Sequence, residues 1–182
     1  MRKILFASIP VLLFLAWSAF RIVAAVQFDQ NAEGHLKRAA DANTIELAQQ
    51  ELDTTLKYLE ENNLTSGYTS ILYNTPDEDI AFWYTNLKSS LKKLSGVSSQ
   101  ASELEKTNVL IKLQETLLDQ GRETRVTVPA GISIYPLNRI ACLLGIFIFI
   151  LLIHEAITIY IKYDRDFKKG NNLLPRGPFS LN

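Results

Sequence analysis

The sequence predicts a mainly α membrane protein, in which two transmembrane helices flank an extracytoplasmic three-helix domain with a small β-hairpin. Long apolar runs near both ends, helical spacing of the apolar residues between them, and an uneven charge distribution lead to this prediction. The 182 residues suffice for one modest domain and two spans. We expect an N-terminal span over residues 1–26, the domain over 27–135, a second span over 136–162 and a cytoplasmic tail over 163–182.

The first apolar run extends from Ile4 to Val26 and contains a single charge, Arg21. Its 23 residues would reach roughly 35 Å as a helix, which is enough to cross a bilayer core. The alternative is a cleaved signal peptide, with a basic start at residues 1–3 and small residues at 23–25. The charge-free stretch over residues 4–20 is longer than a usual signal core, which favours an anchor.

The second apolar run, Leu137 to Ile161, is the stronger of the two. Residues 140–153 carry no charge, and Tyr160 and Tyr163 suit the interfacial region of a bilayer. Cys142, the one cysteine of the sequence, lies in this run. An intrachain disulfide and a cysteine-based zinc site are therefore excluded.

Charge predicts the orientation of the spans. Residues 1–26 carry a net charge of +3, and residues 136–182 carry six basic and three acidic residues, again +3. Residues 27–135 hold sixteen acidic and ten basic residues, a net charge of −6. The positive-inside bias then predicts cytoplasmic termini and a periplasmic or extracellular domain. An acidic domain also argues against a nucleic-acid partner.

Apolar spacing predicts the first helix of the domain over residues 32–62, and the pattern leaves open whether it continues from the first span. Most of the spacings are three or four, as on one face of a helix. The apolar positions are Leu36, Ala40, Ile45, Ala48, Leu52, Leu56 and Leu59.

Two further helices and a hairpin complete the predicted domain. The second helix starts with a capping box at Thr75–Glu78 and ends near Gly96, and the third extends from about Ser99 to Gly121. Their expected core residues are Ile80, Trp83, Leu87, Leu91 and Leu94 in the second, and Leu104, Ile111, Leu117 and Leu118 in the third. Alternation over 125–128 and 132–135 predicts the two strands.

Five aromatic residues form a candidate partner or ligand surface, namely Tyr68, Tyr73, Phe82, Trp83 and Tyr84. Three consecutive helical residues sweep roughly 200° of a helix surface, so they cannot all face one core. We expect Trp83 in the core and the preceding loop over one of its neighbours. The alternative is a partner surface or a small-ligand pocket, since aromatic side chains are favoured in both.

His154 and Glu155 form a candidate intramembrane polar site about two turns from the end of the second span. Ionisable residues in a span are candidates for helix association or proton handling. The other interpretation is structural, with both side chains reaching toward the interface.

Catalytic chemistry has little basis in the sequence. No Gly-x-Ser-x-Gly or Ser-x-x-Lys motif occurs, and His154-Glu155 lacks the second histidine of a zinc-protease helix. Asp77–Asp79 lack the spacing of a calcium loop. We therefore expect no enzyme activity, no cofactor and no metal, and we assign no catalytic residue.

The sequence therefore predicts a non-enzymatic accessory or scaffold subunit of a membrane protein complex. Its expected partners are the lipid bilayer and other membrane subunits or further copies of itself. One alternative is a small extracytoplasmic ligand sensor that signals through its spans. Another is a partner subunit of a transporter or proton-coupled complex.

Overall fold

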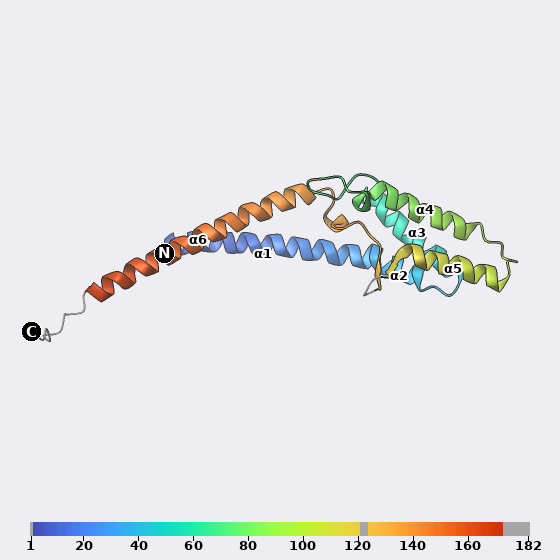
Figure 1. The fold of residues 1–182 in the computed structure, drawn as a ribbon, viewed down its shortest axis with the longest axis horizontal. Coiled ribbons are helices and arrows are strands. Elements are labelled where there is room, and N and C mark those ends of the chain that lie inside the picture. The colour runs from blue at the N-terminus through green and yellow to red at the C-terminus, as the bar shows by residue number, and fades with distance from the viewer. Residues whose placement is uncertain (1, 121–123, 173–182) are drawn as a thin grey trace, which may run out of the picture. The chain divides into compact units, whose positions relative to one another are not determined.

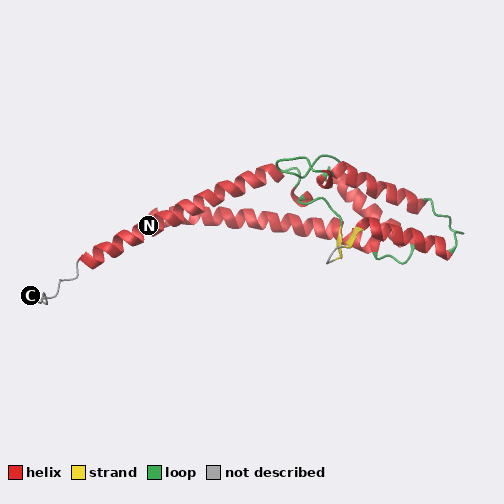
Figure 2. Cartoon of the chain, viewed as in Figure 1, coloured by secondary structure: helices red, strands yellow, loops and turns green. Residues whose placement is uncertain are grey.

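The protein is mainly α-helical in the computed structural model, which describes residues 2–120 and 124–172 (Figures 1 and 2). Two helices are long and apolar enough to cross a membrane, over Ile9–Ala40 and Asn138–Lys168. A two-stranded antiparallel sheet is also present. The mainly α class, the apolar helices at both ends and the small sheet are thereby confirmed.

The chain divides into two compact units, residues 1–18 with 142–182 and residues 19–141. In the first unit, Trp17 of helix α1 (Arg2–Phe28) lies against Gly145 of helix α6 (Asn138–Asn172). A Cβ at Gly145 would lie 2.9 Å from the Trp17 ring, so glycine permits this close approach. The two long helices therefore contact each other within this unit.

In the second unit, α1 continues into the core without a break. A π-helical turn, η1 (Asp29–Glu33), joins it to α2 (Gly34–Ala40). Phe28, Ala32 and Leu36 are all buried, so this helix supplies core residues from both sides of the turn. The sequence left this continuity open.

The helix predicted over residues 32–62 is interrupted at residues 41–44, and α3 occupies Ile45–Glu61. Thr44 causes the restart, because its hydroxyl accepts a hydrogen bond from the Leu47 amide at 3.2 Å. α3 then packs against α2. The predicted apolar positions are nevertheless buried on both sides of the break, because each segment keeps its helical spacing.

Helix α4 occupies Ile80–Ser95, and Asp79, not the predicted Thr75, is its N-cap. The Asp79 carboxylate accepts from the Phe82 amide at 3.1 Å, whereas the Thr75 hydroxyl donates to the Glu78 side chain. Residues 76–78 form a 3-10 turn, η2 (Pro76–Glu78). The helix starts late because Asp79 pairs with Tyr68 in an extended bridge, which is incompatible with helical backbone angles.

Helix α5 occupies Glu103–Leu117. Of its predicted core residues, Leu117 and Leu118 are buried, whereas Leu104 and Ile111 are exposed. Leu113, which was not predicted in the core, is buried as well. The helix ends before Gly121 because the Leu117 carbonyl accepts a hydrogen bond from the Thr127 amide at 2.8 Å. Strand β1 therefore begins at the next residue, Leu118.

The sheet pairs β1 (Leu118–Gln120) with β2 (Thr124–Val126), with Leu118 opposite Val126. The strand predicted over 125–128 overlaps β2, whereas the strand predicted over 132–135 was wrong. The second segment is mostly a 3-10 turn, η3 (Ile132–Ile134), whose Ile132 side chain is buried in the core. Tertiary burial of this short segment overrides its alternating pattern.

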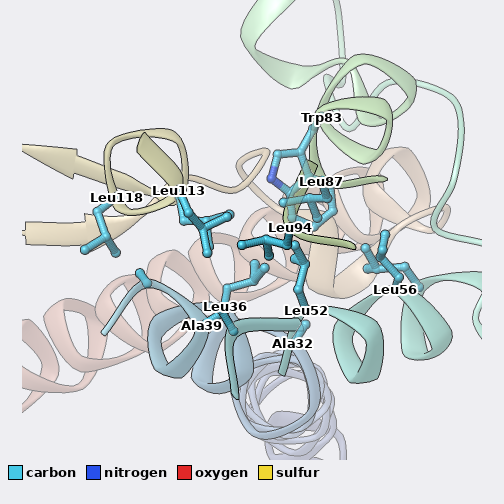
Figure 3. Close-up of a cluster of buried hydrophobic side chains, with 14 of the residues drawn as sticks. Ala32, Leu36, Ala39, Leu52, Leu56, Trp83, Leu87, Leu94, Leu113 and Leu118 are labelled. Carbon is cyan, nitrogen blue, oxygen red and sulfur yellow. The ribbon is translucent and has the colours of Figure 1, made fainter. Parts of the chain in front are cut away.

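The core of the second unit lies between α2, α3, α4 and α5. Figure 3 shows Trp83, Leu87 and Leu94 in a row along α4, above Leu36 and Leu52. All five side chains are buried. Because its buried face is packed in this way, α4 holds the side chains on its exposed faces in fixed positions.

Candidate functional site

The loop over residues 62–79 is held against the start of α4. The Thr69 amide donates to the Glu78 carbonyl at 3.1 Å, and the Ile80 amide donates to the Gly67 carbonyl at 2.9 Å. Together with the Tyr68–Asp79 bridge, these bonds tie both ends of the segment 67–80 together. The loop therefore has a defined position beside α4.

Three of the five predicted aromatic side chains are exposed. Phe82 has 63% of its surface exposed, Tyr73 is exposed to 78%, and Tyr68 is also exposed. Tyr68 and Tyr73 come from the 62–79 loop, and Phe82 from the first turn of α4. The fold thus brings Tyr68 and Phe82 to one shared surface depression, which Tyr73 does not line.

The other two aromatic residues are held in the fold. Trp83 is buried, and its indole N–H donates to the Thr127 carbonyl at 2.8 Å. The Tyr84 hydroxyl donates to the Glu60 carboxylate of α3. This hydrogen bond, with a smaller contribution from burial, raises the pKa of Tyr84. Trp83 is consequently held by the residue that follows β2, and Tyr84 by α3.

Phe82 lines two clefts. One, of about 190 Å³, is lined by Phe82, Trp83 and the β2–η3 connection at residues 127–129. The other, of about 220 Å³, is lined by Phe82, Tyr68 and neighbouring loop residues. Pro76 and Asp79 border both clefts. We call Tyr68, Phe82 and these two clefts the aromatic surface.

A third cleft, of about 410 Å³, lies entirely within residues 19–141. Its polar lining includes Thr69, Ser70 and Asn138, all more than nine-tenths buried. The two hydroxyls and the Asn138 side-chain oxygen have no hydrogen-bond partner within the described structure. We call this the polar cleft. Sequence reasoning missed it, because its residues are far apart along the chain and share no motif.

A buried carboxylate, also missed, joins α2 to α3. The Glu51 side chain is 4% exposed and contacts His35 Nδ1 at 2.6 Å and the Arg38 guanidinium. Its sequence position offered a signal, since Glu51 stands beside Leu52 on the apolar face of α3. Two cationic or hydrogen-bonding partners around one acid make this a structural ion-pair cluster.

His154 and Glu155 lie on α6 in the first unit. The His154 side chain is exposed and Glu155 is half-buried. Among the side chains that the structure describes, neither has a hydrogen bond or an ion pair. The structure therefore adds no second group that would form a relay with them.

In the described part of the chain, no group of three histidine, cysteine or acidic side chains comes together to form a metal site. Cys142 is a half-buried free thiol on α6.

Comparison with known proteins supplies no relationship: no family model, no curated protein and no solved structure matches the chain. Function has to be inferred from the surfaces themselves.

Proposed function

We propose that the protein is a non-enzymatic accessory or scaffold subunit of a membrane protein complex. Its two apolar helices anchor it in the bilayer, and its helical domain, residues 27–135, lies outside the cytoplasm with both termini inside. The charge distribution over the three segments supports this orientation. The aromatic surface is the part that engages a neighbouring membrane subunit.

The exposure of Phe82 carries this proposal. A phenylalanine on a rigid helix costs free energy in water, and burying it against a partner returns about 1.5–3 kcal/mol. Side chains of a partner can insert into the two flanking clefts, as side chains do at the centre of a protein interface. Because Trp83 and Leu87 fix α4 in the core, Phe82 needs little reorganisation to bind.

Site-specific crosslinking tests the proposal. A photo-crosslinking phenylalanine analogue replaces Phe82 in the full chain, and irradiated membranes are analysed by mass spectrometry. We expect one discrete product, either with another membrane subunit or with a second copy of the chain. Leu104 is the matched control, because it is exposed to 71% at the start of α5 and lines none of these clefts.

The same experiment has a quantitative arm. Phe82→Ser should reduce recovery of the complex in mild detergent at least about tenfold, the equivalent of one lost apolar anchor. Leu104→Ser should leave recovery unchanged. A wild-type chain that purifies alone and monomeric, with no product from position 82, would refute the proposal.

A ligand sensor is the second candidate, and two observations favour it. The cleft of about 190 Å³ beside Trp83 offers space for a small molecule. The helix that continues from α1 through η1 into α2 would link such a site mechanically to the span. A saturable increase in thermal stability with small aromatic or amphipathic compounds, abolished by Phe82→Ser, would support this candidate over the scaffold.

A further inference from the structure

The polar cleft combines three unsatisfied polar groups in one place. The Thr69 and Ser70 hydroxyls and Asn138 Oδ1 are buried without partners in the described structure, while Asn138 Nδ2 donates to the Gly131 carbonyl at 2.9 Å. Burying a polar group without a hydrogen bond costs free energy, so such groups usually have a partner in the working protein. Two hydroxyl donors and an amide acceptor define what that partner offers.

The cleft also holds one charge of each sign. Arg21 of α1 and Glu78 of η2 both line it. A guanidinium pairs well with phosphate oxygens, and a carboxylate accepts hydrogen bonds from an ammonium group. This set of groups matches a ligand that carries both a phosphate and a primary amine.

The rim of the cleft is apolar and exposed. Ile71, Leu72 and Tyr73 follow Ser70 directly, and Leu72 and Tyr73 are exposed to 82% and 78%. Consecutive exposed side chains of this size are unfavourable in water and suited to the boundary between lipid headgroups and acyl chains. The rim thus offers apolar contact next to the polar floor.

The position of the cleft in the fold specifies the occupant. Arg21 is the one charge of the first apolar run, and Asn138 is the first residue of α6. The cleft therefore lies where both apolar helices meet the domain, which is the headgroup level of a bilayer that these helices cross. We propose that the polar cleft binds the headgroup of an aminophospholipid of the phosphatidylethanolamine class.

In this arrangement, Arg21 donates to phosphate oxygens, and the Thr69 and Ser70 hydroxyls, which are buried in the lipid-free protein, turn toward the cleft and donate to them as well. Asn138 Oδ1 and the Glu78 carboxylate accept from the ammonium group. Ile71, Leu72 and Tyr73 contact the glycerol and upper acyl region. The polar cleft shares no lining residue with the aromatic surface. The lipid proposal can therefore be tested independently of the proposed partner subunit.

Native mass spectrometry of the full chain in mild detergent tests the assignment. Equimolar phosphatidylethanolamine, phosphatidylcholine and phosphatidylglycerol are added, and the lipid that stays bound on activation is identified. We expect one phosphatidylethanolamine to be retained. Phosphatidylcholine has no N–H donor for Asn138 and Glu78, and phosphatidylglycerol has no cation, so both should be retained at least about fivefold less.

Variants separate the cleft from general lipid adhesion. Arg21→Gln and Ser70→Ala should each lower retention about tenfold, as expected for lost hydrogen bonds to a charged group. Arg139→Gln is the matched control. Arg139, at the start of α6, is exposed like Arg21 but does not line the cleft. Leu72→Ser alters only the exposed rim and should lower retention without affecting folding.

Three outcomes would overturn the proposal. Equal retention of the three lipids, unaffected by Arg21→Gln, would show non-specific lipid adhesion. Displacement of the lipid by glycerophosphoethanolamine at an equal concentration would identify a site for a soluble phosphate compound. Retention that falls as much in Arg139→Gln as in Arg21→Gln would show that charge near the bilayer, and not the cleft, holds the lipid.

Discussion

Two buried polar groupings in the domain differ in how their hydrogen-bonding capacity is used. Glu51 has its partners within the fold, in His35 and Arg38, which tie α3 to α2. Ser70 and Asn138 in the polar cleft have polar atoms without such partners among the residues that the structure describes. A satisfied buried group contributes to stability, whereas an unsatisfied one lowers stability until it gains a partner. The difference distinguishes a buried group that the fold satisfies from those that we propose a ligand satisfies.

The largest effect is expected from the Glu51 cluster. The double variant His35→Leu with Arg38→Met leaves a carboxylate buried without its partners, which should cost about 3 kcal/mol of unfolding free energy. For a chain of this size, the thermal midpoint should fall by roughly 10 °C, measured by circular dichroism in detergent. Lys57→Met, which breaks an exposed pair with Asp53, should leave the midpoint unchanged. An unaffected double variant would remove the distinction between the two groupings.

A smaller effect is expected from Tyr84, which is a partly exposed counterpart of the Glu51 cluster. Its pKa is raised in the folded protein, mainly by the hydrogen bond to Glu60. The stabilisation is therefore fully present below the unfolded-state pKa of about 10 and is lost as the pH rises through the folded-state value. Because the pair is near solvent, the loss should stay under about 0.5 kcal/mol.

Thermal midpoints measured between pH 8 and pH 11 would show this loss as a decline at the alkaline end. Tyr84→Phe should reduce the decline, since the titrating hydroxyl is gone. A decline of the same size in Tyr84→Phe would assign the pH dependence to other groups.

The smallest effect is expected in the polar cleft itself. Ser70→Ala in the lipid-free protein should change the unfolding free energy by less than about 0.5 kcal/mol or increase it, because an unpaired hydroxyl is removed. Ser90→Ala is the matched comparison. Its buried hydroxyl donates to the Asn86 carbonyl at 2.9 Å, and its loss should cost about 1 kcal/mol. Equal destabilisation by both variants would mean that Ser70 has a partner after all.

The spacing of apolar residues predicted which helix positions are buried, but it did not predict features that depend on tertiary contacts. Leu52, Leu56 and Leu59 were predicted to face the core from spacing alone, and all are buried. The break at residues 41–44 was missed, although the step of five residues from Ala40 to Ile45 departs from the helical spacing there. Asp79 was missed as the cap, because the competing bridge to Tyr68 is a tertiary contact. The partner of the strand over 125–128 was misplaced, because a hydrogen bond from the Thr127 amide ends α5 at Leu117 and β1 begins at Leu118.

The candidate sites follow the same division. The alternation of Phe82 and Trp83 between surface and core follows from helical geometry, and Trp83 was predicted in the core. The polar cleft was beyond prediction, because Arg21, Ser70 and Asn138 meet only after the chain has folded. The Glu51 cluster was intermediate, since an acid beside Leu52 on an apolar face already calls for a partner on another helix.

The π-helical turn η1 also determines the rotational phase of α1 relative to the core. Such a turn accommodates one residue more than an α-helix would, and each residue of a helix corresponds to about 100° of rotation. Removing one residue from Asp29–Glu33 would restore a regular α-helix and rotate Arg21 about a quarter turn away from Thr69 and Ser70. Leu36 and the rest of α2, which follow the turn, would keep their positions in the core.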